Sequence, residues 1–290
     1  MSATTRHTGT ATGTATGTAD LHMHTRHSDG APTVEALLRH VVTRTSLDVI
    51  AIADHDTIAG ALEAQRIVRR DGYLVEVVVG EEVSTREGHL VGLFLRERVA
   101  PGLSAAATIE AIHAQGGLAF APHPYLRVRQ KEGGPIMMLG LGDTIRELDL
   151  DGIESINATP FLGRANHRAV AYNKTRRLPA LGNSDGHIPQ AVGKGYTRFP
   201  GKTAGDLRAA IERGQTTAHA RPYRPGELLT YLGFWLRQQG LLPRLTQPRA
   251  VRRRADVVTI AAAVAAAASR RPLQADADTL DGLRTMAARD

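Results

Sequence analysis

The sequence of 290 residues predicts an α/β fold in which about seven strands, most of them parallel, form a barrel-like sheet. Two patterns predict this fold. Short, β-branched apolar runs of strand length alternate with stretches whose apolar residues recur at helical spacing. In addition, clusters of His and acidic residues lie at or just past the ends of the apolar runs. The C-terminal ends of strands are where α/β barrels build their sites, so both patterns indicate the same architecture.

The expected elements begin near Thr18, where a short strand carries Asp20 to His24. Pro32 and Thr33 open a helix whose apolar residues follow an i, i+3, i+4 stripe. Further strands are expected at 48–53, 74–79, 90–95, 118–121, 152–156 and 180–181, and further helices at 57–70 with Thr57 as its cap, at 104–115 and at 165–176. A Gly- and Met-rich loop over 131–142 is expected to cover or flank a site at this end of the strands.

Composition excludes several classes of protein. The chain has no cysteine, which rules out disulfides and thiolate metal sites. Its longest apolar run, 257–268, is too short and too rich in Ala to span a bilayer, so no membrane attachment is expected. The polar start of the chain has no apolar stretch typical of a secretory signal. We therefore expect a cytoplasmic protein; its oligomeric state cannot be predicted.

Three regions are expected along the chain. Residues 1–17 repeat Gly, Thr and Ala and are predicted to be a disordered leader. Residues 18–220 are expected to form the main α/β domain, with 23 Lys and Arg against 23 Asp and Glu. Residues 221–290 carry 12 Lys and Arg against 6 Asp and Glu, and they are predicted to be a basic, Ala-rich helical appendage or tail. Its Arg cluster at 249–254 leaves a nucleic-acid contact open.

The His and acidic clusters indicate a metal centre. His22 and His24 point to the same face of a strand, because side chains alternate along it. Ionisable residues directly after a buried strand, as at 54–56, need partners. Burial of either neighbouring acid, Glu81 or Glu82, requires a cation. Imidazole and carboxylate are ligands of divalent metals, and nine or ten of them converging predict more than one ion and a multinuclear hydrolase.

The segments DLHMHTRHSDG, ADHDT, GEEVS with GHLVG, PHP and NSDGH resemble the successive motifs of the PHP (polymerase and histidinol phosphatase) superfamily. The resemblance covers residues 18–220. It implies a distorted (β/α)7 barrel, here with a C-terminal helical appendage, that holds two or three divalent ions (Mn²⁺, Zn²⁺, Fe²⁺ or Mg²⁺). It also implies that His22, His24, Glu82 and Asp185 bind one ion, that Glu82 bridges to a second held by His89 and His123, and that Asp29, His55 and His187 hold a third.

Asp29 stands where some members of the family have His, which favours a harder ion such as Mn²⁺ or Mg²⁺. Asp54 and Asp56 are expected either to orient metal-bound imidazoles, the role favoured for Asp54, or to carry a proton to the leaving group. The phosphate and substrate contacts expected beside them are Arg127, Arg129, Lys131, Asn157, Lys194 and, as a rival, Arg198.

Two metal ions in such a site can activate a shared hydroxide and hold the phosphoryl oxygens. The resemblance therefore implies a metal-dependent phosphoesterase, and the compact first motif favours nucleotides or short oligonucleotides as substrates, as in 3′,5′-nucleotide bisphosphatases and 5′–3′ exonucleases. Histidinol phosphatase and a hydrolase of carboxylic or carbamate esters remain open. A binding module without turnover is disfavoured, because every motif position still holds a competent ligand.

Overall fold

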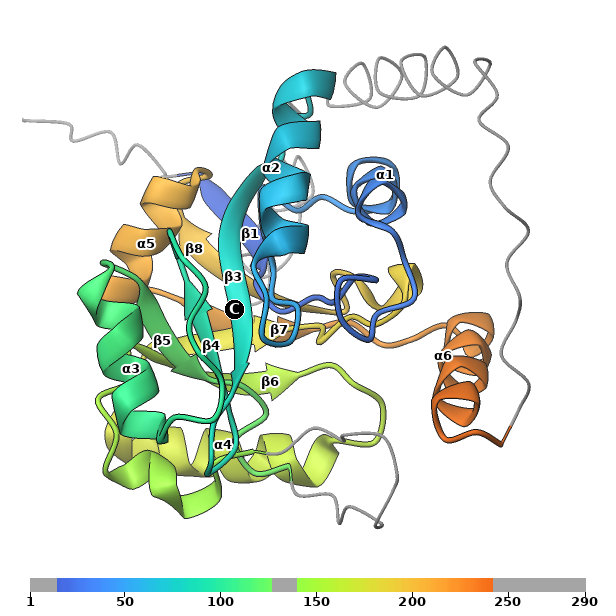
Figure 1. Cartoon of the computed structure of the whole chain (residues 1–290). Coiled ribbons are helices and arrows are strands. Elements are labelled where there is room, and N and C mark those ends of the chain that lie inside the picture. Colours follow the sequence, from blue (N-terminus) through green and yellow to red (C-terminus); the bar gives the residue numbers. More distant parts are fainter. Residues whose placement is uncertain (1–14, 127–139, 242–290) are drawn as a thin grey trace, which may run out of the picture. The chain divides into compact units, whose positions relative to one another are not determined.

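A computed structural model describes residues 15–126 and 140–241, and these lie in the first of two compact units, Met1–Thr246 and Gln247–Asp290. The described strands form one sheet in the order β7-β6-β5-β4-β3-β2-β1-β8-β9 (Figure 1). Their bounds are Thr16–Asp20 (β1), Val49–Ile52 (β2), Glu76–Ser84 (β3), His89–Leu93 (β4), Leu118–Ala121 (β5), Gly152–Asn157 (β6), Ala180–Asn183 (β7), Gly195–Pro200 (β8) and Thr217–Ala220 (β9).

The sheet curls into a nearly closed barrel, which confirms the predicted fold class. At the open seam, the backbone N–H of Gly182 in β7 donates to the hydroxyl of Thr197 in β8 over 3.0 Å. A Cβ on Gly182 would lie 2.6 Å from the backbone oxygen of Tyr196 in β8 and 2.7 Å from the backbone nitrogen of His219 in the edge strand β9, so only glycine permits this approach of the two edges. The ends of the sheet therefore meet at a position that the sequence marks with a glycine.

The sheet is mixed, and this differs from the expectation of mostly parallel strands. Pairs β1/β2, β2/β3, β5/β6 and β6/β7 are parallel, whereas β3/β4, β4/β5, β1/β8 and β8/β9 are antiparallel. The short connection between β3 and β4 makes a hairpin, because there is no room in it for a crossover helix. The strands β8 and β9 were not predicted.

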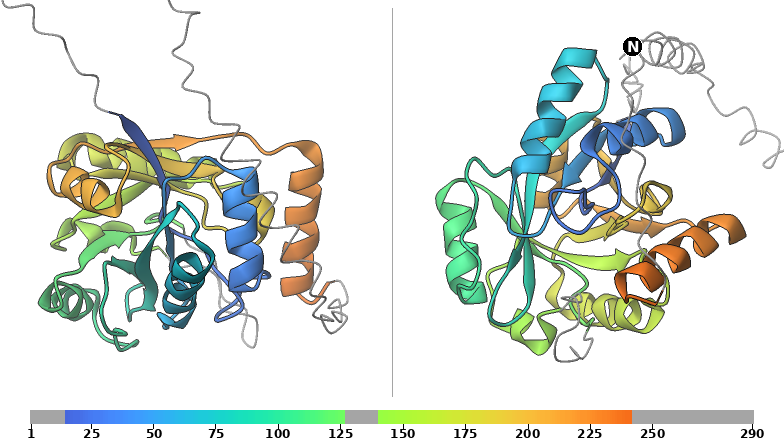
Figure 2. Two further views of the ribbon diagram at one scale, coloured as in Figure 1. Left: turned by 90° about the horizontal axis from the view of Figure 1, so that it is seen from above. Right: turned by 45° about the vertical axis from the view of Figure 1, so that its right-hand side comes forward.

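The described helices are Val34–Arg44 (α1), Ala59–Asp71 (α2), Ala105–Ala114 (α3), Gly163–Arg176 (α4), Ala204–Glu212 (α5) and Pro225–Gln238 (α6), with 3₁₀ turns at Gly142–Arg146 (η1) and Pro189–Ala191 (η2). Thr33 and Ser104 cap α1 and α3 through their hydroxyls. The hydroxyl of Thr57 accepts from the N–H of Ala59, the first residue of α2, over 3.2 Å, although Ile58 is the residue directly before the helix. Helix α5 was not predicted. The views in Figure 2 show α6 at the outside of the barrel, beside η2, which α1 also contacts.

Two apolar cores support the barrel. In β2, Val49 and Ala51 face an inner core with Phe120, whereas Ile50 and Ile52 face the core beneath the surrounding helices. This alternation is the one expected of a strand between two apolar layers.

Helix α5 adds Leu207 and Ile211 to the inner core. The N–H of Ala204 at its start bonds to Glu76, the first residue of β3. Helix α5 therefore lies at the N-terminal ends of the parallel strands and leaves their C-terminal ends for the site.

Three expectations lie partly or wholly outside the described residues: the leader up to residue 14, most of the Gly- and Met-rich loop, and the basic region beyond residue 241. Within residues 15–126 and 140–241, none of the helices combines the length and apolar character needed to cross a membrane.

Candidate metal centre

The nine side chains predicted as ligands meet at one rim of the barrel: His22, His24, Asp29, His55, Glu82, His89, His123, Asp185 and His187. Most of them follow the C-terminal end of a parallel strand. Two do not, because Glu82 lies inside β3 and His89 begins β4. Since β4 is antiparallel to β3, its first residue nevertheless lies at the same rim, and Ser84 pairs with His89 in the hairpin.

The carboxylate of Glu82 is the centre of this cluster, and five imidazoles surround it. One oxygen, Oε1, lies 3.0 Å from a ring nitrogen of both His89 and His123. The other, Oε2, lies 3.2 Å from Nε2 of His22, 3.3 Å from Nε2 of His24 and 3.4 Å from Nδ1 of His55. Glu82 is completely buried, so its charge is balanced by these rings alone among its described contacts.

Asp185 supplies a second carboxylate to the same Nε2 atoms of His22 and His24 that Glu82 faces. Its Oδ1 lies 3.3 Å from Nε2 of His24 and 3.6 Å from Nε2 of His22. The backbone of Asp185 has φ = 50° and that of His123 has φ = 26°, both in the left-handed region that non-glycine residues rarely adopt. Such strain at two neighbouring positions is typical of a functional site.

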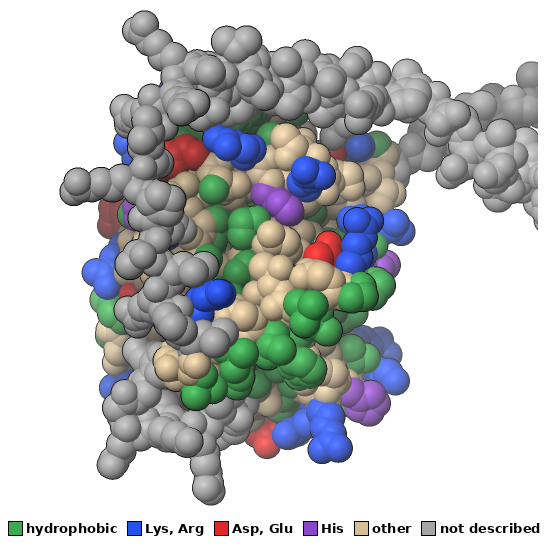
Figure 3. Space-filling model, turned by 90° about the vertical axis from the view of Figure 1, so that its right-hand side faces the viewer, with side chains coloured by type: hydrophobic (Ala, Val, Ile, Leu, Met, Phe, Trp, Pro, Cys, Tyr) green, Lys and Arg blue, Asp and Glu red, His purple; other side chains and the backbone are tan. Residues whose placement is uncertain are grey.

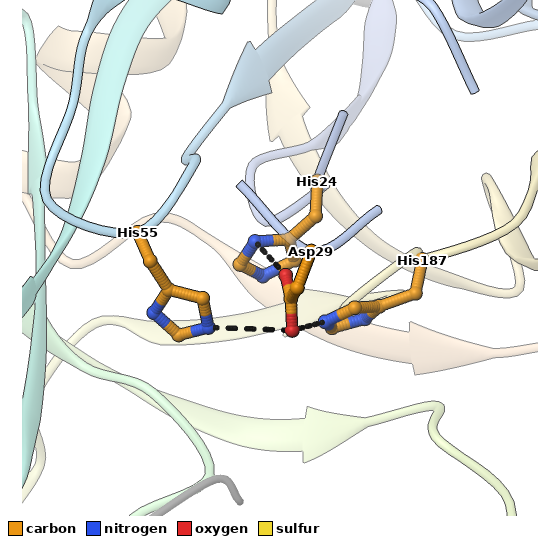
Figure 4. A group of neighbouring side chains, drawn as sticks. All are labelled: His24, Asp29, His55 and His187. Carbon is orange, nitrogen blue, oxygen red and sulfur yellow. Dashed lines mark hydrogen bonds and ion pairs between the residues drawn. The ribbon is translucent and has the colours of Figure 1, made fainter. Parts of the chain in front are cut away.

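A third group lies nearest to solvent and contains Asp29, His24, His55 and His187 (Figure 4). Oδ2 of Asp29 lies 3.2 Å from Nε2 of His187 and 3.8 Å from Nε2 of His55, and its Oδ1 lies 3.6 Å from Nδ1 of His24. The side chains of Asp29 and His55 are 42% and 20% exposed, whereas His24 is fully buried. The cluster therefore opens to solvent at Asp29 and His55.

The cluster has the properties of a site for divalent cations. Among the described residues, four of its buried atoms have no hydrogen-bond partner: both ring nitrogens of His24, Nδ1 of His123 and Oδ1 of Asp185. Buried polar atoms without partners are costly, and coordination of an ion would satisfy them. Four overlapping groups of the nine side chains, all within the described part of the chain, hold their ligand atoms within 4.8 Å of one another.

The pKa shifts within the cluster also indicate a cation site. Burial by itself would raise the pKa of Glu82, but the imidazoles of His55, His22 and His89 outweigh it and hold that pKa well below its usual range. Burial would lower the pKa of His24, yet Asp185 and Glu82 raise it to about 10. The carboxylates thus favour positive charge in this buried space, as a cation site requires.

Glu154 of β6 supports the cluster, and the sequence analysis did not identify it. Its Oε1 accepts from Nδ1 of His22 (3.2 Å) and from the amide of Asn183 (3.0 Å). Its Oε2 accepts from the backbone N–H of His123 (2.6 Å) and from Asn157 (2.8 Å). With Nδ1 of His22 donating to Glu154, Nε2 is left free toward Glu82 and Asp185. An acidic residue inside the apolar run GIESIN was the available signal.

Asp54 and Asp56 do not orient imidazoles, contrary to the role favoured for Asp54. Asp54 accepts from the N–H and hydroxyl of Thr25 and from the hydroxyl of Ser28. Asp56 accepts from the N–H and hydroxyl of Ser84. Both carboxylates instead hold the backbone around the cluster, because short polar side chains next to a strand end readily bond to nearby backbone groups.

The residues expected to contact substrate lie in different surroundings, and some of them lie outside the described residues. Arg127, Arg129 and Lys131 lie outside the described residues. Asn157 is buried and engaged within the protein, donating to Glu154 and to Oδ2 of Asp185. Lys194 is paired with Glu227 of α6, so its ammonium group is used at that contact rather than at the cluster. Arg198 is exposed on β8.

Comparison with known proteins finds one family model and several relatives, which cover different shares of the chain. A family model described as PHP-associated matches residues 163–216. An uncharacterized protein of Methanocaldococcus jannaschii is 42% identical over 173 residues, which cover 56% of this chain and 93% of that protein. The 5′-3′ exoribonuclease Rnm of Escherichia coli is 41% identical over 78 residues, which cover 26% of each chain.

A solved structure with a similar fold is a two-domain protein from Bacteroides vulgatus that contains a predicted PHP-like metal-dependent phosphoesterase. Its TM-score is 0.58 at 18% identity, and the match covers 77% of this chain and 71% of that one. At 18% identity, this similarity shows that the two proteins share a fold.

Proposed function

Because the chain belongs to the PHP superfamily of metal-dependent phosphoesterases, we propose that it hydrolyses phosphate esters of nucleotides or short oligonucleotides. The observation that carries this proposal is the carboxylate of Glu82 at the centre of five imidazoles, next to buried atoms that lack partners. The choice of a nucleotide substrate is supported by the identity to the E. coli exoribonuclease, which extends over 78 residues.

The nine side chains would divide between three ions. His22, His24, Glu82 and Asp185 would hold the first, and Glu82 would bridge to a second held by His89 and His123. Asp29, His55 and His187 would hold the third, with His24 beside them. Divalent ions bound by these residues would lower the pKa of water and offset the charge on phosphoryl oxygens.

The chain's own residues prepare the site for this chemistry. Glu154 fixes the ring of His22 through Nδ1 and holds the backbone of His123. The carbonyl of Asp185 accepts from Nδ1 of His187 over 2.9 Å, which leaves Nε2 of that ring directed at Asp29. Rings held in one tautomer and one orientation bind a cation without reorganising first.

The test is a hydrolysis panel with the Mn²⁺-loaded full-length protein. The substrates are adenosine 3′,5′-bisphosphate, a 5′-phosphorylated trinucleotide, histidinol phosphate and a p-nitrophenyl carboxylic ester. We expect turnover of the first two, with loss of at least about a hundredfold in His24→Ala and Asp185→Ala, since each variant removes a ligand. His113→Ala serves as the matched control, because its imidazole pairs with Asp151 outside the cluster.

Turnover of the carboxylic ester alone would overturn the proposal and assign the chain to ester hydrolysis. Turnover of histidinol phosphate alone would overturn the nucleotide assignment while leaving phosphoester hydrolysis intact. Equal loss in His113→Ala and His24→Ala would show that the cluster has no special role.

A further inference from the structure

A small third apolar core lies beside the metal centre, separate from the two cores of the barrel. It contains Ile188 and Ala191 of the η2 region and Tyr231 of α6. Ala31, Tyr223 and Phe234 pack against it. Ala31 comes two residues after Asp29, and Ile188 comes directly after His187. This core thus joins α6 to the two loops that carry the outermost candidate ligands.

Helix α6 faces these loops with one stripe of side chains at helical spacing: Glu227, Tyr231, Phe234 and Gln238. Glu227 forms its ion pair with Lys194, which follows η2. Tyr231 packs in the third core with Ile188, the residue directly after His187. The stripe therefore contacts the rim of the barrel at several separate points.

Phe234 and Gln238, at the C-terminal end of the stripe, directly contact residues of the third ligand group. The side-chain amide of Gln238 donates to the backbone carbonyl of Asp29 over 3.0 Å. The ring of Phe234 lies 6.0 Å, centroid to centroid, from the ring of His187. The carboxylate of Asp29 is the most exposed of the nine candidate ligands, so its loop depends on such contacts for its position.

A second link joins the same two loops. The backbone N–H of Ala31 donates to the carbonyl of His187 over 2.8 Å. Movement of either loop would therefore disturb the other, and both are covered by α6. The inner ligand His22 and the backbone of His123 are held instead by Glu154 of β6.

We propose that Phe234 and Gln238 of α6 are positioning residues that hold Asp29 and His187 in place for the outermost metal ion. The inference rests on the proposed metal sites and adds that occupancy of one of them depends on this helix. Neither residue would touch the ion or the substrate. Gln238 acts through Asp29, and Phe234 acts through His187. Loss of either contact should weaken the binding of one ion and leave the other ions bound.

The opposite face of α6 provides the control. Leu228, Leu229, Leu232 and Trp235 are exposed there, and Figure 3 shows hydrophobic side chains gathered on this side of the molecule. Leu229 is 68% exposed and takes no part in the third core. Leu229→Ala therefore changes the same helix without touching either loop.

The experiment compares Mn²⁺ binding by the wild-type full-length chain, Gln238→Met, Phe234→Ala and Leu229→Ala. Bound ions are counted by elemental analysis after gel filtration, and affinities come from titration. Gln238→Met keeps the length of the side chain but removes the donor, so it should fold as the wild type does. We expect the dissociation constant of one ion to rise about tenfold to a hundredfold in the first two variants, with the remaining ions unaffected. Leu229→Ala should match the wild type.

Unchanged ion number and affinity in both Gln238→Met and Phe234→Ala would overturn the positioning role while leaving the proposed function intact. Equal loss in Leu229→Ala would also overturn it, because the effect would then come from the stability of α6 as a whole. A wild-type chain that binds no Mn²⁺ would overturn the metal sites themselves and the inference with them.

Discussion

Glu82 shows how a single side chain can organise a metal centre. Its two oxygens face different imidazoles, with His89 and His123 near one and His22, His24 and His55 near the other. A carboxylate placed in this way can bridge two cations, whereas an imidazole usually binds one. Its neighbour Glu81 is also buried but accepts from the N–H of Val99, on the other face of β3. Alternation along the strand thus separates the two acids.

Glu154 gives a prediction at the scale of one residue. Glu154→Gln keeps the shape of the side chain but removes the charge that holds Nδ1 of His22. We expect the affinity for at least one metal ion to fall about tenfold to a hundredfold, because partners of ligating imidazoles have effects of this size. Titration with Mn²⁺ measures the change.

Glu110→Gln is the matched control, since Glu110 is exposed on α3. Binding by Glu154→Gln that equals the control would contradict the supporting role of this carboxylate.

At this scale, the sequence could predict which residues converge but not how each is supported. Spacing and strand ends were enough to bring together the nine candidate ligands, because ionisable residues after buried strands need partners. Glu154 was missed, since three of the four residues it contacts, His22, His123 and Asn183, are separated from it by 29 to 132 positions in the chain. Asp54 was misjudged for a similar reason. Its partners Thr25 and Ser28 become neighbours only when β1 and β2 pair.

At the scale of elements, helix α2 begins against the polar network of Asp54. A Cβ on Gly60 would lie 2.2 Å from Oδ2 of Asp54 and 3.0 Å from the hydroxyl of Thr25. Asp54 cannot move away freely, because it already accepts bonds from Thr25 and Ser28. The glycine at this position therefore permits close contact between the helix and the loop before Asp29.

Gly60→Ala should lower the free energy of unfolding by about 1–3 kcal/mol, the usual cost of overpacking, although alanine is the better helix former. Urea denaturation measures the change. Gly233→Ala in α6 is the control, because the nearest atom to its Cβ is the flexible guanidinium of Arg237 at 3.4 Å. That variant should be neutral or slightly stabilising. Equal midpoints for the two variants would contradict the close contact at Gly60.

The elements themselves were predictable where local pattern decides them. The apolar stripe and the cap Thr33 placed α1 correctly, and the helix expected at 104–115 matches α3 to within one residue at each end. The antiparallel direction of β4 was not foreseen, since a strand's direction depends on its connections rather than on its own residues. Strands β8 and β9, which continue the sheet beyond β1, were also missed; β9 has only four residues, none of them fully buried, so it carries no apolar run.

At the scale of the whole molecule, metal binding and stability should be coupled. The cluster joins residues from the ends of β1, β2, β5 and β7 and from the β3–β4 hairpin, so it exists only in the folded chain. Ligands that bind the native state alone stabilise it by about 2.7 kcal/mol at a hundred times their dissociation constant.

Addition of Mn²⁺ to protein treated with a chelator should therefore raise the melting temperature by roughly 5–10 °C in a thermal scan. His24→Ala should show a smaller rise, because its two unpartnered nitrogens are gone. A melting temperature that stays the same with and without Mn²⁺ would show that the cluster is assembled without a role in cation binding.

The most direct test of metal-dependent phosphoester hydrolysis by this site is release of inorganic phosphate from adenosine 3′,5′-bisphosphate, followed before chelation, after EDTA and after Mn²⁺ is restored. We expect turnover that disappears with EDTA and returns with Mn²⁺ in the wild type. In Asp185→Ala, which lacks the carboxylate 3.3 Å from His24, turnover should not return. Turnover that continues unchanged through EDTA treatment, or that survives in Asp185→Ala, would contradict metal-dependent hydrolysis by this site.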